Sequence, residues 1–228
     1  MHDIAADRLF GKPFSLSEWD FCNPYDYAAE GAFLVGAYGA LQNWNMVCRF
    51  DYTTWGSTMD REETVLDYFD IVNDPVRLLS ERAGALFFAR GDVAASQLKL
   101  PLLIDKKEML ERDSWRKDYP EDLRKMALIC QVGSVITTKG RAVPEIGNVD
   151  ATLQAGMLPA GSYDRVAQRF TSSTGELILN AKQGTFQVIT PRSEAALLPE
   201  GKRSAGNYLS VSNRHGFAVW PMRAVRDD

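Results

Sequence analysis

The sequence predicts a mixed α/β protein in which a parallel βαβ unit precedes an antiparallel β-module. Two observations support this prediction. Near the N-terminus, two strand-like segments flank a helix-like run of 16 residues. In the last third, short strand-like runs alternate with turn residues, which is typical of antiparallel sheets. The length of 228 residues is sufficient for one or two domains.

The first predicted strand covers residues 12–19. A period of two places Phe14, Leu16 and Glu18 on one face of this strand. Asp26 is the expected N-cap of the following helix, because its carboxylate can accept hydrogen bonds from the free N–H groups of the first turn.

That helix is expected over residues 27–42, and a second strand over residues 46–52. Two strands joined by a helix of this length form a parallel pair with a right-handed crossover. Asp74-Pro75 begins another predicted helix, which ends near Gly91.

The middle of the chain has a less regular pattern. It predicts an extended segment, two short helices, a strand and a loop, in this order: residues 98–104, 106–113, 121–130, 131–138 and 139–148. In the last third, residues 170–180 and 184–192 form a predicted hairpin, and further strands are expected over residues 208–211 and 217–220.

These patterns divide the chain into three segments. Residues 1–95 contain the βαβ unit, residues 96–165 are a mixed α+β linker region, and residues 166–228 form an antiparallel β-domain. Charge also differs along the chain: residues 161–228 carry nine Lys or Arg and six Asp or Glu, whereas the preceding residues carry 17 and 24.

The composition excludes several classes of partner. A net charge of −4 and a pI near 5.3 argue against a broadly basic nucleic-acid surface. No apolar run approaches the roughly 18–20 residues of a membrane helix, so no membrane partner is expected. The N-terminus lacks the pattern of a signal peptide, which favours a cytoplasmic location by default.

Cysteine and histidine usage points to no metal chemistry. Cys22, Cys48 and Cys130 are odd in number and have no C-x-x-C spacing, so neither a disulfide framework nor a zinc ribbon is expected. His2 and His215 lie near the two ends of the chain. We therefore expect no metal and no organic cofactor.

The first 60 residues are rich in aromatic and acidic side chains. They hold 12 of the 24 aromatic residues and eight acids, but only three bases. Rings that stack and carboxylates that accept hydrogen bonds suit an uncharged, polyhydroxylated ligand. The alternative is an aromatic core with a solvated acidic face.

The sharpest local feature is Glu18, which lies between Ser17 and Trp19 at the end of a predicted parallel strand. The C-terminal ends of such strands carry the catalytic groups of barrel enzymes. A carboxylate beside a tryptophan is suited to attack the anomeric carbon of a sugar as a nucleophile. The alternative is an exposed glutamate at a strand end with no catalytic role.

Four segments resemble the last part of a clan A glycoside hydrolase: residues 11–19 (Gly-Lys-Pro-Phe-Ser-Leu-Ser-Glu-Trp), 29–31, 41–44 and 49–52. Enzymes of that clan, among them β-galactosidases and endoglucanases, are (β/α)8 barrels that act with retention. The resemblance implies that residues 1–95 form a partial (β/α) barrel, made of its last two βα units, with a β-domain appended. It also implies hydrolysis of a β-linked glycoside.

The resemblance further implies roles for individual residues. Glu18 matches the nucleophile at the end of the seventh strand, and Trp55 matches the ring that forms the sugar platform. The other predicted substrate-binding residues are Trp19, Tyr52, Asn23 and Arg49.

One catalytic group of the clan has no counterpart. The acid/base glutamate usually lies in an Asn-Glu pair far upstream of the nucleophile, but this chain has only 17 residues before Glu18 and no Asn-Glu pair. Asp51, at the end of the next strand, is the remaining choice for a second catalytic carboxyl group.

Two functions therefore stay open: a retaining glycosidase with Glu18 as nucleophile, or a non-catalytic carbohydrate-binding or assembly module derived from one. A two-stranded remnant of a barrel has open edges, and open edges recruit other chains. We therefore expect a homo-oligomer that covers the open sheet edge. The resembling enzymes are often exported, although this chain shows no export signal.

Overall fold

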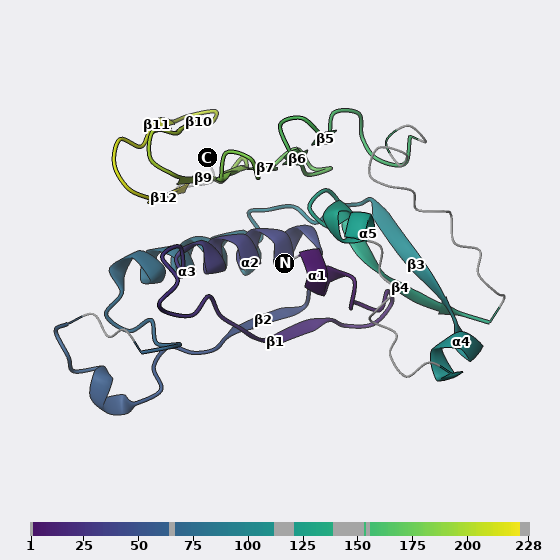
Figure 1. Cartoon of the computed structure of the whole chain (residues 1–228), viewed down its shortest axis with the longest axis horizontal. Helices are drawn as coiled ribbons and strands as arrows, with labels where there is room; N and C mark the ends of the chain where they lie inside the picture. The colour runs from purple at the N-terminus through teal and green to yellow at the C-terminus, as the bar shows by residue number, and fades with distance from the viewer. Residues whose placement is uncertain (1, 64–66, 112–120, 139–152, 154–155, 224–228) are drawn as a thin grey trace.

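The computed structural model describes residues 2–63, 67–111, 121–138, 153 and 156–223. Two long helices lie between two sheets (Figure 1). A two-stranded parallel sheet covers one side of the helices, and a six-stranded antiparallel sheet covers the other. The side of the parallel sheet that faces away from the helices is not covered by any described element.

The predicted βαβ unit is confirmed. Strand β1 (Ser15–Trp19) pairs in parallel with β2 (Met46–Arg49), and helix α2 (Glu30–Leu41) connects them. Both strands and the helix are shorter than predicted. The predicted N-cap at Asp26 is wrong, because residues 26–29 form turns and α2 then begins at Glu30 without a side-chain cap.

Helix α3 (Pro75–Phe88) begins where predicted. The Asp74 carboxylate caps it by accepting hydrogen bonds from the backbone N–H groups of Val76 and Arg77, at 3.1 and 3.0 Å. Helices α2 and α3 approach each other closely, since a Cβ on Gly36 would lie 2.5 Å from the Cα of Gly84. Only glycine at these positions permits this approach.

A second parallel pair follows α3, formed by the extended segment predicted at residues 98–104 and the strand predicted at residues 131–138; their pairing was not predicted. Strand β3 (Lys99–Asp105) pairs along its length with β4 (Gln131–Thr137). The short helices α1 (His2–Ala5), α4 (Lys106–Glu111) and α5 (Glu121–Met126) accompany this pair. The predicted loop 139–148 lies outside the described residues.

The C-terminal module is an antiparallel sheet, as predicted. Its strand order is β12-β9-β8-β7-β6-β5, with these bounds: β5 Tyr163–Asp164, β6 Arg169–Thr171, β7 Leu177–Asn180, β8 Thr185–Ile189, β9 Ser193–Leu198 and β12 Ala218–Arg223. The hairpin of β10 (Arg203–Ala205) and β11 (Ser210–Ser212) lies beside it.

One hydrophobic core connects the helices with the antiparallel sheet. Phe33 of α2 contacts both Phe87 of α3 and Phe186 of β8, with ring centroids 5.1 and 6.0 Å apart. Tyr38 of α2 stacks on Phe186 at 5.4 Å. The mixed α/β class is thus confirmed, and the described residues form no closed barrel. Among them, no helix is long and apolar enough to cross a bilayer.

The first residue of α2 makes stability depend on pH. Burial raises the pKa of Glu30 from 4.5 to about 7. The fold therefore favours the protonated carboxyl group of Glu30. The stability that this preference contributes is fully present below pH 4.5 and is lost as the pH rises through about 7.

Replacement of Glu30 by Gln should remove this loss. In urea unfolding, Glu30→Gln should gain stability relative to the wild type between about pH 5 and pH 8. Glu111→Gln, at an exposed position of α4, is the control and should show no such gain. An equal pH dependence in wild type and Glu30→Gln would contradict the assignment.

Candidate functional site

Glu18 is projected from the parallel sheet by a β-bulge. Leu16 pairs with Val47 and Trp19 pairs with Arg49, so two residues of β1 lie opposite one residue of β2. The extra residue breaks the alternation of β1, and Ser17 and Glu18 are both exposed. Bulges of this kind redirect side chains, and they are common beside active sites.

The bulge corrects one prediction. Leu16 is buried against the helices, whereas Glu18 is exposed, so the two residues do not share a face as strict alternation predicts. Glu18 is instead exposed, together with Ser17.

Trp19 faces the helices instead. A Cβ on Gly31 of α2 would lie 3.1 Å from its ring, and the Arg49 guanidinium lies 4.9 Å from the ring centroid on another side. The ring predicted to bind sugar is therefore engaged in packing beneath the strand ends.

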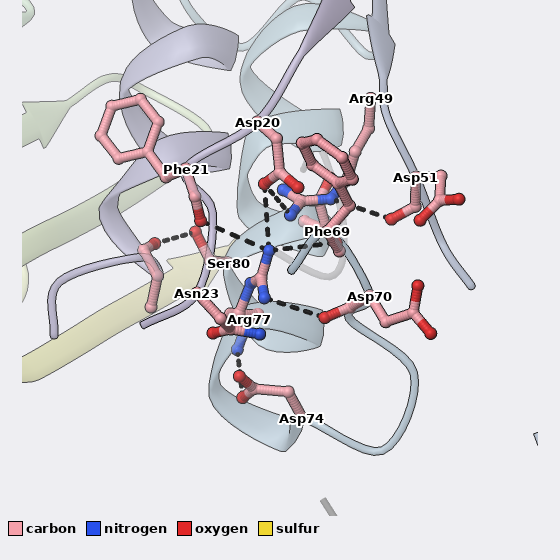
Figure 2. A network of polar contacts seen from close by, with 12 residues as sticks. Asp20, Phe21, Asn23, Arg49, Asp51, Phe69, Asp70, Asp74, Arg77 and Ser80 are labelled. Carbon is pink, nitrogen blue, oxygen red and sulfur yellow. Dashed lines mark hydrogen bonds and ion pairs between the residues drawn. The ribbon is translucent and has the colours of Figure 1, made fainter. Parts of the chain in front are cut away.

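Arg49 is held in a network of ion pairs just beyond the ends of β1 and β2 (Figure 2). One of its terminal nitrogens donates to Asp20, and the other donates to Glu81 of α3 at 2.7 Å. With the tryptophan ring as a third contact, Arg49 connects both strands to α3. The structure thus places this predicted substrate-binding residue inside the network.

Arg77 is the most connected member of this network. Its Nη2 donates to the Asp20 carboxylate at 3.0 Å and lies 3.4 Å from the carbonyl oxygens of Phe21 and Phe69. Its Nη1 donates to the Asp70 carbonyl at 2.9 Å. The side chains of Asp20 and Arg77 are each only 3% exposed. One buried guanidinium therefore connects the loop after β1 with the loop before α3.

Burial shifts the ionisation of this network. It raises the pKa of Asp20, although Arg49 and Arg77 oppose the rise, and it raises the pKa of Glu81, which Arg49 opposes. Burial lowers the pKa of Arg77. Two acids and two bases balance in charge, so the network can remain buried.

Asp51 lies at the same edge as Glu18. The backbone N–H of Phe50 donates to the Trp19 carbonyl at 3.0 Å, which brings the two strand ends together. The Asp51 Oδ2 is 3.3 Å from the Thr54 hydroxyl, and its Oδ1 is buried without a hydrogen-bond partner.

The carboxylate of Asp70 anchors the segment after β2. The Thr54 N–H and hydroxyl donate to its carboxylate at 2.7 and 2.8 Å, and the Thr53 hydroxyl donates at 3.2 Å. Burial alone would raise the pKa of Asp70, but these hydrogen bonds and one with Asp51 lower it. This anchor fixes the loop that carries Tyr52 and Trp55.

The rings of Tyr52 and Trp55 are the free aromatic surfaces of the predicted set, at 50% and 63% exposure. Asn23 has a connecting role instead: its side-chain amide donates to the Asp67 carbonyl at 2.7 Å, and its backbone N–H donates to the Tyr68 carbonyl at 2.8 Å. Glu18 and Asp51 thus lie at neighbouring strand ends, and Tyr52 and Trp55 are exposed in the loop after β2. The side chains of Trp19, Asn23 and Arg49 are engaged in contacts within the protein.

Sequence reasoning missed Asp20, Arg77, Glu81, Asp70 and the exposed ring of Phe50. Asp20 directly follows the predicted strand, and this position could have indicated its role at the strand end.

No described group of three His, Cys, Asp or Glu side chains is arranged to hold a metal ion. Comparison of the chain with protein-family models, with curated proteins and with solved structures finds no match.

Arg77→Lys should lower the free energy of unfolding by about 2–4 kcal/mol, because an ammonium cannot reproduce the fork that reaches Asp20 and the backbone carbonyls. Urea unfolding measures the loss. Arg82→Lys, exposed on the same helix, should change stability by less than about 0.5 kcal/mol. A loss of the same size in both variants would show that the network does not bear on stability.

Proposed function

We propose that the chain carries the nucleophile of a retaining glycoside hydrolase that acts on a β-linked glycoside, and that β1 and β2 are the last two strands of a partial (β/α) barrel. One observation supports this proposal above the others: the bulge at the C-terminal end of a parallel strand, where Glu18 is exposed.

In the proposed reaction, a Glu18 oxygen attacks the anomeric carbon and forms a covalent glycosyl ester as the glycosidic bond breaks. The leaving oxygen takes a proton from an acid, and water then hydrolyses the ester to regenerate the carboxylate. Asp51 is the proposed second carboxyl group, since the hydrogen bond from Phe50 to Trp19 places its strand end beside that of Glu18. Tyr52 and Trp55 supply stacking surfaces.

A second function is a carbohydrate-binding or assembly module without catalysis. Its support is the position of Asp51, whose carboxylate is already engaged by Thr54 and Asp70. In this case the exposed rings remain useful and Glu18 contributes only hydrogen bonds to a bound sugar.

The open sheet supports a further element of the proposal, a homo-oligomer. In the described part of the chain, β1 and β2 pair only with each other, so each strand has a second edge without a partner strand. A neighbouring copy that covers these edges would also supply the acid.

Dinitrophenyl β-glycosides of several sugars test the nucleophile directly, because their leaving group departs without help from an acid. We expect release of dinitrophenol by the wild type, and a fall of kcat by at least about a thousandfold in Glu18→Gln. Azide should restore turnover in Glu18→Ala by attacking the anomeric carbon in place of the carboxylate.

Glu111→Gln on α4 is the matched control and should retain wild-type turnover, since α4 lies at the other end of the molecule (Figure 1). Release that is equal in the wild type and Glu18→Gln, or release from no sugar, would contradict the catalytic proposal. Binding of a sugar without turnover would favour the second function.

A further inference from the structure

A small cavity lies between the antiparallel sheet and the hairpin of β10 and β11. All six residues of β9 are buried, because the helices cover one face of this strand and the hairpin covers the other (Figure 1). The cavity measures about 30 Å³. A water molecule needs about 10–15 Å³, so the cavity encloses about two or three non-hydrogen atoms. The side chains that determine its chemistry are those of Glu194, Ser204, Leu209, Trp220 and Met222.

Glu194 of β9 is the charged side chain in the described wall of the cavity, and it is only 6% exposed. Its carboxylate accepts hydrogen bonds from three successive backbone N–H groups of the turn between β10 and β11: that of Asn207, that of Tyr208 at 3.0 Å and that of Leu209 at 3.2 Å. A side chain at Gly206 would collide with this carboxylate. The turn therefore closes over Glu194 because residue 206 is glycine.

The three N–H groups stabilise the carboxylate, but they do not neutralise its charge. No Lys or Arg side chain in the described part of the chain forms an ion pair with Glu194, whereas the buried acids Asp20 and Asp92 each pair with an arginine. Buried charges in proteins are normally paired with a charge of opposite sign. Glu194 therefore favours a cationic ligand over a neutral or an anionic one.

Trp220 of β12 adds an aromatic face to the same cavity. Met222 lies opposite Glu194 in the register of β9 and β12, and alternation places Trp220 on the same face of the sheet. Trp220 lines the cavity and is 47% exposed, so its ring borders the mouth. The face of an indole ring attracts an ammonium group, and the side chains of Met222 and Leu209 offer apolar contacts to the adjoining methylene group.

We propose that this cavity binds the end of a primary amine, with its ammonium group between the Glu194 carboxylate and the Trp220 ring. The small volume excludes a sugar ring, and the carboxylate repels phosphates and other carboxylates. A free alkylamine and the lysine side chain of a partner share this chemistry. The inference goes beyond the proposed function, since the antiparallel sheet is separate from the parallel sheet that carries Glu18.

Titration with n-butylamine hydrochloride at pH 7, where the amine is protonated, tests the site. We expect saturable shifts of the Trp220 indole N–H signal and the Leu209 amide signal in ¹H–¹⁵N NMR spectra. The Kd should be about 1 mM, which is reasonable for so small a ligand. n-Butanol has the same length but no charge, and it should bind at least about tenfold more weakly at equal ionic strength.

Two replacements should weaken binding, with the Leu209 amide as the readout. Glu194→Gln removes the charge and Trp220→Leu removes the ring, and each should raise the Kd for n-butylamine at least about fivefold. Glu194→Gln also alters the contacts of the turn, so Trp220→Leu keeps the test valid if that variant loosens the hairpin. Glu200→Gln, at an exposed position after β9, is the matched control and should keep the wild-type Kd.

Blocked amino acids distinguish the two sources of the amine. Tighter binding of N-acetyl-lysine methylamide than of n-butylamine would assign the site to a lysine side chain, and weaker binding would assign it to a free amine. The arginine counterpart should bind at least about tenfold more weakly than the lysine compound, because the planar guanidinium is larger than an ammonium group.

Three results would overturn the inference. They are the absence of any saturable shift with n-butylamine, equal affinity for n-butylamine and n-butanol, and an unchanged Kd in both Glu194→Gln and Trp220→Leu. None of them bears on Glu18, whose role is decided by turnover of the dinitrophenyl glycosides.

Discussion

The buried ion pairs of Asp20, Arg49, Arg77 and Glu81 determine the arrangement of the candidate site. Each strand end of the parallel pair contributes one of these residues, and α3 contributes two. Burial of one unpaired charge costs several kcal/mol, so removal of a single member would leave its partner destabilised. The network thereby fixes where β1 and β2 end relative to α3, and both loops that carry the exposed rings start from these ends.

The contrast between the buried and the exposed residues at the end of β1 follows from this arrangement. Trp19, Arg49 and the network occupy the side of the helices, where packing and ion pairs hold them. Glu18 is exposed at the bulge, which adds one residue to β1. The buried network thus lies directly beside the exposed Glu18 on the same strand, and rigid support of this kind is what the proposed nucleophile would require.

Local patterns allowed the prediction of much of the fold. Asp74-Pro75 starts α3 through a cap made within four residues, and the hairpin of β7 and β8 depends on alternation and turn residues. The bulge could not be predicted, because Ser17 and Glu18 are both polar and alternation shows no sign of an extra residue. The ion pair of Asp20 and Arg77 could not be predicted either. The two residues are 57 positions apart, and either charge alone is typical of a solvated surface.

The central claim is that Glu18 forms a covalent bond with a sugar, and a trapping experiment tests it most directly. A 2-deoxy-2-fluoro β-glycoside with a dinitrophenyl leaving group slows the breakdown of a glycosyl ester more than its formation, so the ester accumulates. Mass spectrometry of the intact chain should show one added fluorosugar, and peptide mapping should place it on Glu18. A label on another residue, or no label with any sugar tested, would contradict the account.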